Sequence, residues 1–300
     1  MNGIDLKKLK SFSSMEFHLE NPLPSDSTDL SPLFLHESDH MPSRGCIDVA
    51  VRREIIAIIS EMCSGYDQLV PYLSVNYLDR FLSSQKFPKK PWTLSLIATS
   101  CVSLAAKMQG VSIPLSDLQV NGGLVFDSET VQRAEVLILG ALKWRMRSIT
   151  PFSFIPIFIS LFQIQELALR HALIARTTEI ILTAQTDINL LSFKPSIAAA
   201  SALLCASNEL LPLQFPSFWV EISDCSHVNK DHLEQCYDKM LQAAYVGRHE
   251  GVHGSASTSG TASNVLDQPF GSASSGSQKT DGSGTSGRSL KRRKPSYSDQ

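Results

Sequence analysis

The sequence predicts an all-α fold made of two helical domains in tandem. Apolar residues recur at helical spacing from residue 47 to 247, and no apolar–polar alternation with hairpin turns interrupts them. Two long segments, Trp92–Met108 and Lys194–Leu210, are apolar on almost every side and rich in Ala, Ser and Cys. A helix of this kind is normally surrounded by other helices, so each segment is expected to form the centre of one bundle.

The composition indicates a chain that can bury a sizeable core. Hydrophobic residues make up 43% of the 300 positions and charged residues 19%, with a formal net charge of −2. This balance argues against nucleic acid as a partner, because nucleic-acid-binding domains are usually basic. The six cysteines are scattered without a CxxC pair, so reduced thiols are expected rather than a zinc site or a disulfide framework. Without a signal sequence or an apolar run of about 18 residues, an intracellular protein with no membrane partner is expected.

The first domain is predicted to hold five helices. Apolar stripes and breaker residues place them at about 46–64, 71–85, 92–109, 114–121 and 128–143. Lys89, Lys90 and Pro91 separate the second helix from the third. Asp127 or Ser128 suits the start of the fifth, because a short oxygen side chain satisfies free amides of the first turn.

The second domain is also predicted to hold five helices, at about 152–163, 166–185, 195–209, 217–223 and 230–245. Pro151 and Pro195 stand at two of the starts, where the missing N–H of proline costs little. Asn229 or Asp231 is the expected cap of the last helix.

The two ends differ in composition from the helical centre. Residues 1–43 are polar and interrupted by prolines, and residues 248–300 are rich in Gly, Ser and Thr. Such segments bury too little apolar surface to offset chain entropy, so both are predicted to be disordered, leaving domains at 44–148 and 149–247. The tail carries a basic cluster typical of a nuclear import signal, which predicts a nuclear protein with a cytoplasmic pool: Lys291, Arg292, Arg293 and Lys294.

The sequence has no signature of catalysis. Patterns of the GxGxxG, Walker, HExxH and GxSxG types are absent, and the eight histidines are dispersed. The chain is therefore expected to bind other proteins and not to be an enzyme, with no cofactor and no metal site of its own.

Several blocks of the chain, in order, resemble the cyclin box. They are SVNYLDRFLSS at 74–84, SLAAKM at 103–108, DLQV at 117–120 and VQRAEVLILGALKWRMRSITPFSF at 131–154. The last block is most similar to plant D-type cyclins, and KPSIAAASALL and PLQFPSF in the second half are similar to a short, divergent subgroup of them. The resemblance implies two tandem five-helix cyclin folds. It also implies a regulatory subunit that activates a cyclin-dependent protein kinase at the G1/S step of the cell cycle.

The resemblance further implies which residues contact the kinase. In the family, the lysine that ends the third helix and a glutamate within the fifth dock onto the kinase, and here they match Lys107 and Glu135. ATP and metal would be held by the kinase. The apolar neighbours expected to add interface area are Leu104, Met108, Leu137, Ile138 and Ala141.

Asp79 is expected to have a structural role. It lies within the apolar stripe of the second helix, so its carboxylate needs a partner. In the family this partner is an arginine of the first helix, which matches Arg52. The pair is predicted to hold the first domain together.

The family's substrate-docking patch is degenerate in this chain. It matches Val51, Ile55 and Ile58 of the first helix, but Ile58 replaces the usual Trp and Glu54 replaces a usually apolar residue. Substrate docking through this patch is therefore in doubt.

The motif by which D-type cyclins bind retinoblastoma-related proteins, LxCxE, is degenerate as well. It matches Leu33, Leu35 and Glu37, with Leu35 in place of Cys. A retinoblastoma-related protein and kinase inhibitors are thus candidate partners beyond the kinase.

Two alternatives to an activating subunit remain open. One is a cyclin-shaped module that scaffolds or titrates a kinase without activating it. The other is a module that contacts transcription machinery or DNA, which would need basic helix faces, and residues 44–247 hold no obvious basic block.

Overall fold

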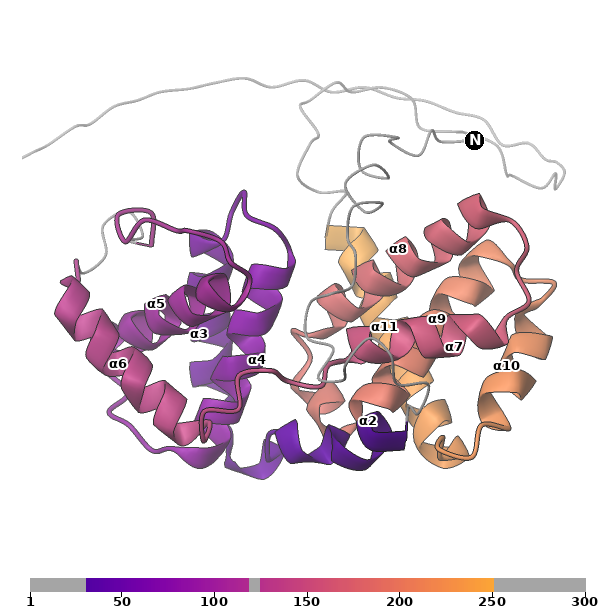
Figure 1. Cartoon of the computed structure of the whole chain (residues 1–300), viewed down its shortest axis with the longest axis horizontal. Coiled ribbons are helices and arrows are strands. Elements are labelled where there is room, and N and C mark those ends of the chain that lie inside the picture. Colours follow the sequence, from indigo (N-terminus) through magenta and orange to yellow (C-terminus); the bar gives the residue numbers. More distant parts are fainter. Residues whose placement is uncertain (1–30, 119–124, 251–300) are drawn as a thin grey trace, which may run out of the picture. The chain divides into compact units, whose positions relative to one another are not determined.

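The computed structural model describes residues 31–118 and 125–250, and all regular elements within these ranges are helical (Figure 1). The first half contains α3 (Val49–Met62), α4 (Leu69–Ser84), α5 (Pro91–Met108) and α6 (Ser128–Ala141). The second half contains α7 (Ile155–Leu161), α8 (Leu167–Ala184), α9 (Pro195–Leu210), α10 (Phe215–Ser223) and α11 (Lys230–Glu250). Shorter helical segments are α2 (Ser31–His36), η1 (Glu37–His40), η2 (Arg44–Cys46), η3 (Pro151–Phe154) and η4 (Ile188–Ser192).

Each half is built around one central helix, as predicted. α5 packs against α3, α4 and α6, and α9 packs against α7, α8, α10 and α11. Small residues such as Ala98, Cys101 and Ala105 on α5, and Ala199 and Ala202 on α9, are fully buried. Their size lets neighbouring helices approach closely. The predicted all-α fold of two tandem bundles is confirmed.

The helix starts follow from the residues that precede them. The Asp127 side chain accepts a hydrogen bond of 2.6 Å from an amide in the first turn of α6, and Asn229 accepts one of 2.9 Å at the start of α11. Pro91, Pro151 and Pro195 occupy the first helical position of α5, η3 and α9. A proline there loses no intrahelical hydrogen bond.

The predicted helix over 114–121 is wrong for the part that the structure describes. Residues 115–118 form turns, and residues 119–121 lie outside the described ranges. Asp117 N donates to Pro114 O at 3.0 Å and Leu118 N to Leu115 O at 3.2 Å. These hydrogen bonds join residues three positions apart, whereas those of an α-helix join residues four positions apart.

The predicted disordered arm over residues 1–43 differs from the structure at its C-terminal end. Residues 31–40 form α2 and η1, and Leu33 and Glu37 are buried there. The polar composition of the arm hid these contacts, because only a few of its residues, such as Leu33, Phe34 and Glu37, pack against the core. Residues 1–30 and 251–300, including the expected import cluster, lie outside the described residues.

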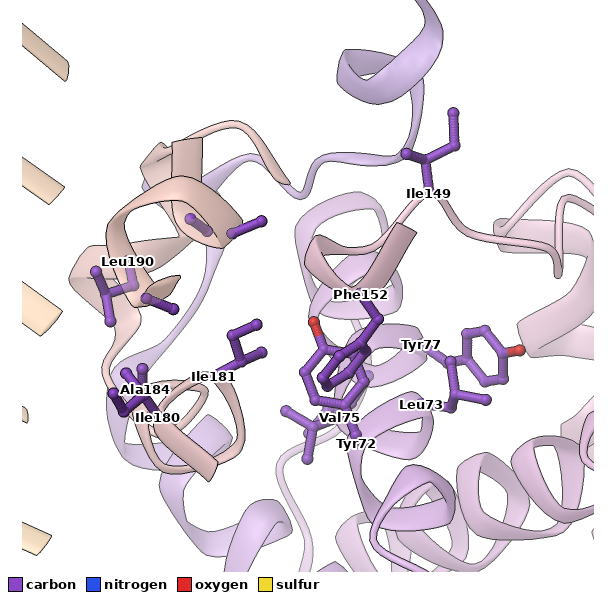
Figure 2. Close-up of a cluster of buried hydrophobic side chains, with 14 of the residues drawn as sticks. Tyr72, Leu73, Val75, Tyr77, Ile149, Phe152, Ile180, Ile181, Ala184 and Leu190 are labelled. Atoms are coloured by element: carbon purple, nitrogen blue, oxygen red, sulfur yellow. The ribbon is translucent and has the colours of Figure 1, made fainter. Parts of the chain in front are cut away.

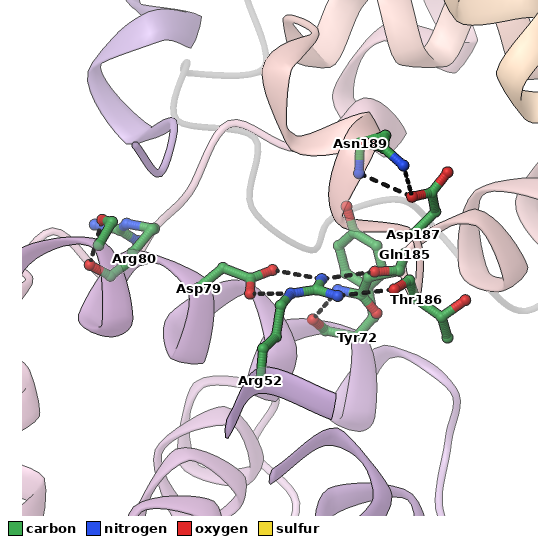
Figure 3. A network of polar contacts seen from close by, with 9 residues as sticks. Arg52, Tyr72, Asp79, Arg80, Gln185, Thr186, Asp187 and Asn189 are labelled. Carbon is green, nitrogen blue, oxygen red and sulfur yellow. Dashed lines mark hydrogen bonds and ion pairs between the residues drawn. The ribbon is translucent and has the colours of Figure 1, made fainter. Parts of the chain in front are cut away.

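Arg52 on α3 joins the two halves (Figure 3). Its Nε and Nη2 donate to the two carboxylate oxygens of Asp79 on α4 at 2.6 and 3.0 Å. Its Nη1 and Nη2 also donate to the backbone carbonyls of Thr186 and Gln185, both at 2.8 Å. These carbonyls directly follow α8, where a cation is favoured by the helix dipole. The predicted ion pair is present, and it also ties the first half to the second.

Burial determines how much the Arg52–Asp79 ion pair contributes to stability. Arg52 and Asp79 are both buried, and burial raises the pKa of the Asp79 carboxyl while the hydrogen bonds from Arg52 oppose the rise. Desolvation of a buried pair can cancel its attraction, so the pair mainly fixes how α3, α4 and α8 meet. Removing one partner leaves an uncompensated buried charge.

An apolar cluster lies where α4 meets the second half (Figure 2). Tyr72 and Val75 from α4 join Phe152 from η3, Ile181 from α8 and Leu190 from η4, all buried. The rings of Tyr72 and Phe152 meet edge to face with centroids 4.7 Å apart. Edge-to-face pairs are favourable, so the cluster adds packing energy to the fixed geometry of the ion pair.

The connection between the halves is held by α4 as well. Arg80 donates to Ser148 Oγ at 2.7 Å and to the Arg145 carbonyl at 2.8 Å, and Tyr77 donates to the Met146 carbonyl at 3.0 Å. One face of α4 therefore contacts α8, and another anchors residues 145–148.

We predict that Arg52→Ala lowers the free energy of unfolding by about 3–5 kcal/mol, because Asp79 and two carbonyls lose their buried partner. Urea unfolding followed by circular dichroism measures this change. Arg53→Ala is the matched control, since Arg53 is the exposed neighbour on the same helix. Equal effects of the two substitutions would contradict the bracing role of Arg52.

Candidate functional site

Lys107 and Glu135 meet on the surface of the first half. Lys107 lies in the last turn of α5 and Glu135 within α6, and the ammonium Nζ is 2.6 Å from both carboxylate oxygens. The Lys107 side chain is 60% exposed, whereas that of Glu135 is 9% exposed. The structure therefore brings together the two residues that the sequence paired, with the cation outermost.

The end of α5 fixes the position of Lys107. Gly110 has a left-handed backbone with φ of 65°, its N–H donates to the Lys107 carbonyl at 3.2 Å, and the Val111 N–H donates to Ala106 O at 2.9 Å. This pair of bonds is the Schellman ending of a helix, which glycine permits at little cost. The chain turns away there and leaves the Lys107 side chain open to solvent.

The charged pair can bind backbone groups of a partner. The Lys107 ammonium has three donors, and its two hydrogen bonds to Glu135 leave at least one directed elsewhere. A carbonyl at the end of a partner helix is a suitable acceptor. Because Glu135 holds the ammonium in place, the side-chain entropy lost on binding is reduced.

The predicted apolar neighbours divide into core and surface. Leu104 and Ile138 are buried, so the expectation that they supply interface area is wrong. Leu104 lies on α5, which other helices surround, and Ile138 follows the buried Glu135 by one helical turn on the inward stripe of α6. Leu137 is 59% exposed, Met108 is exposed, and Ala141 is half-buried.

The sequence analysis missed two exposed apolar residues, one on α6 and one just beyond its end. Val136 on α6 is exposed, and Trp144, just beyond the end of α6, is 67% exposed. Lys143 and Trp144 have positive φ values of 54° and 60°. Bulky residues rarely adopt this backbone, and such strain often accompanies function. No sequence pattern predicts that Trp144 is exposed, because a tryptophan after an apolar helix usually belongs to the core.

We call the set Lys107, Met108, Glu135, Val136, Leu137 and Trp144 the α5–α6 face. It combines one exposed cation with four exposed apolar side chains. Exposed apolar groups that gather around a fixed polar contact are typical of protein-binding surfaces.

The degenerate substrate-docking patch does not form an exposed strip. Val51 and Ile55 are buried in the core, and Ile58 is half-buried. Glu54, on the same helix, is exposed. The three apolar positions therefore serve packing between α3 and its neighbours.

The degenerate LxCxE segment is folded back onto the second half. Glu37 is buried, and its carboxylate accepts hydrogen bonds from Ser196 N at 2.9 Å and Ser196 Oγ at 3.1 Å, at the start of α9. Phe34 stacks on His227 with centroids 4.4 Å apart, and Leu33 is buried. Of the three motif residues, Leu35 alone is exposed. The expectation that Leu33 and Glu37 bind a partner conflicts with these contacts.

Metal ligation, membrane spanning and cysteine reactivity can be judged for the ranges 31–118 and 125–250. No group of three or more His, Cys, Asp or Glu side chains there could hold a metal ion, and no helix there is long and apolar enough to cross a membrane. The six cysteines are free, and burial raises the pKa of the Cys63 thiol to about 11. A thiol with such a pKa is unreactive at neutral pH.

Comparisons with known proteins match the whole helical region. The family described as "Cyclin, N-terminal domain" matches residues 28–147, and "Cyclin, C-terminal domain" matches residues 149–265. "Putative cyclin-D6-1" of Arabidopsis thaliana is 45% identical over 94% of this chain and 99% of its own length. "Cyclin-D6-1" of Oryza sativa subsp. japonica is 37% identical over 77% of this chain and 76% of its own length.

A solved structure shares the fold. The viral cyclin from herpesvirus saimiri aligns with a TM-score of 0.56 over 71% of this chain and 96% of its own, at 22% identity. This likeness concerns the arrangement of helices.

We predict that Leu33→Ala lowers the free energy of unfolding by about 2–5 kcal/mol, because a buried leucine leaves a cavity. Leu35→Ala, in the same short helix but exposed, should change it by less than about 0.5 kcal/mol. Thermal or urea unfolding of the two variants measures the difference. If both substitutions were neutral, the segment would not be attached to the core in solution.

Proposed function

The chain belongs to the cyclin family as a D-type cyclin, a regulatory subunit of a cyclin-dependent protein kinase, and we propose that it activates its kinase through the α5–α6 face. The observation that carries the proposal is the Lys107–Glu135 pair at 2.6 Å, with an exposed ammonium among exposed apolar residues. The proposed role of its kinase is progression through the G1/S step, in line with the D-type names of the relatives.

Activation follows from a general feature of protein kinases. Their catalytic lysine must pair with a glutamate on the mobile C-helix. A partner that binds the inward position of that helix more tightly than the outward position shifts the equilibrium toward the active form. In the proposal, Lys107 binds a backbone carbonyl at one end of the C-helix, and the apolar side chains of α6 pack along it.

The apolar part of the face is proposed to supply most of the affinity. Buried aromatic anchors commonly dominate binding energy, and Trp144 is the largest exposed side chain of the face. Leu137 and Val136 would surround it and exclude water. The positive φ at Trp144 would then be a cost of presenting the indole outward.

Cyclins regulate catalysis and do not carry it out. For this chain we propose no catalytic activity of its own, with ATP and metal bound by the kinase. The motif-free sequence supports this proposal.

The remaining partners and the location are also proposals. Kinase inhibitors and a retinoblastoma-related protein are proposed to meet the assembled kinase complex. For the latter, the burial of Leu33 and Glu37 favours recognition as a kinase substrate over capture by the degenerate motif. The basic cluster at residues 291–294 supports import into the nucleus.

A second candidate function is a cyclin that binds the kinase without activating it. The α5–α6 face would serve either role equally, because binding alone does not fix which kinase state is preferred. Only a measurement of catalysis separates the two.

We predict that Lys107→Glu weakens the complex with a plant cell-cycle kinase by about 2–5 kcal/mol. The reason is that Glu135 and the kinase carbonyl, both buried in the complex, lose the ammonium that pairs with them. Co-elution and calorimetry measure the loss. Lys230→Glu on α11 is the matched control, since it reverses an exposed lysine in the other half. An unchanged affinity for Lys107→Glu would remove this residue from the interface.

We predict that the purified chain raises the activity of that kinase toward a retinoblastoma-related substrate. Trp144→Ala should reduce both binding and activation, because it removes the proposed anchor. Formation of a stable complex with no rise in phosphorylation would support the titrating role and contradict activation.

A further inference from the structure

A polar groove lies in the second half, apart from the α5–α6 face. Its lining residues come from the connection between α7 and α8, from the start of α8 and from α10 with Gln214 before it, and its volume is about 470 Å³. Pockets that bind ligands usually measure about 300–1,000 Å³. Gln163, Gln165, Gln214 and Ser217 line it with groups that can both donate and accept hydrogen bonds.

The groove carries negative charge without a matching cation. Glu166 and Glu221 line it, and no lysine, arginine or histidine does. Within the described part of the chain, neither glutamate takes part in an ion pair. Two carboxylates in one concave site favour a positively charged ligand.

A second observation points to a missing partner. Oε2 of Glu221 is buried and has no hydrogen-bond partner among the described residues. Buried polar atoms are nearly always hydrogen-bonded, and an unpaired carboxylate oxygen is costlier than a neutral one. Since the Glu221 side chain as a whole is half-buried, a rotation of its carboxylate would bring this oxygen to a donor in the groove.

Apolar side chains also line the groove, namely those of Ile164, Leu169 and Phe218. A metal ion would use none of this apolar surface, and the described residues contain no metal-binding group of three ligands. A peptide would use both the polar and the apolar lining residues.

We infer that this groove binds a peptide segment of another protein, with an arginine at Glu166 and Glu221 and apolar neighbours against Ile164, Leu169 and Phe218. Arginine fits best, because its guanidinium can donate to both carboxylates and to glutamine carbonyls at once. The groove lies on a different half from the α5–α6 face, so the inference does not depend on kinase docking.

The test measures binding of a short fluorescent peptide, one arginine flanked by leucines, to the full chain by fluorescence anisotropy. The wild-type chain should bind it, and Glu221→Gln should weaken binding about tenfold or more, because a charge-assisted hydrogen bond is lost. Glu166→Gln is a second variant at an exposed position, in case Glu221→Gln perturbs folding. Glu234→Gln, on an exposed turn of α11, is the matched control and should leave binding unchanged.

A peptide with citrulline in place of arginine keeps the shape and loses the charge, and it should not bind. Kinase affinity should be the same for the wild type and Glu221→Gln, which separates this site from the α5–α6 face. Equal binding of the arginine and citrulline peptides, or binding that neither glutamate variant weakens, would overturn the inference. Displacement of the peptide by Mg²⁺ at constant ionic strength would assign the groove to a divalent cation, which also overturns it.

Discussion

The buried guanidinium of Arg52 is the contact on which the arrangement of the two halves depends. It binds the Asp79 carboxylate in the first half and the Gln185 and Thr186 carbonyls in the second. Few side chains could do this, because the contact needs several donors in one plane and a charge that burial does not remove. A lysine would offer no fork, and an apolar residue would leave the carbonyls after α8 unpaired. The apolar cluster around Tyr72 and Phe152 then packs against a fixed frame.

The pair proposed to contact the kinase is of the opposite kind. The Arg52–Asp79 pair is buried on both sides, whereas the Lys107–Glu135 pair has one buried partner and one exposed partner. In the second pair, Glu135 fixes the position of the Lys107 ammonium, which in the proposal donates to a backbone carbonyl of the kinase. Both pairs join neighbouring helices of the first half, but Arg52 also binds carbonyls of the second half and is buried, whereas Lys107 is exposed. A preformed, half-exposed charge loses little conformational freedom on binding, which suits a subunit that must hold a mobile kinase helix.

Much of the fold could be predicted from the sequence because helical spacing and capping are local. The stripes of α4 and α6, the small residues of α5 and the prolines that begin η3 and α9 all act within a few positions. The bonds from Arg52 to Gln185 and Thr186 cross more than 130 positions, so no local pattern announces them. The attachment of α2 by Leu33 and of η1 by Glu37 is hidden for the same reason. The resemblance to cyclins paired Lys107 with Glu135. The exposure of Trp144, in contrast, depends on a positive φ angle that no sequence pattern indicates.

The central claim is that the α5–α6 face is the surface that holds the kinase. Hydrogen–deuterium exchange of the full chain, with and without kinase, tests it most directly, because exchange reports which amides become protected. The account predicts that protection on binding concentrates at the end of α5, along α6 and at residues 143–144. Protection confined to α2 or α10, with no change on α5 and α6, would contradict it.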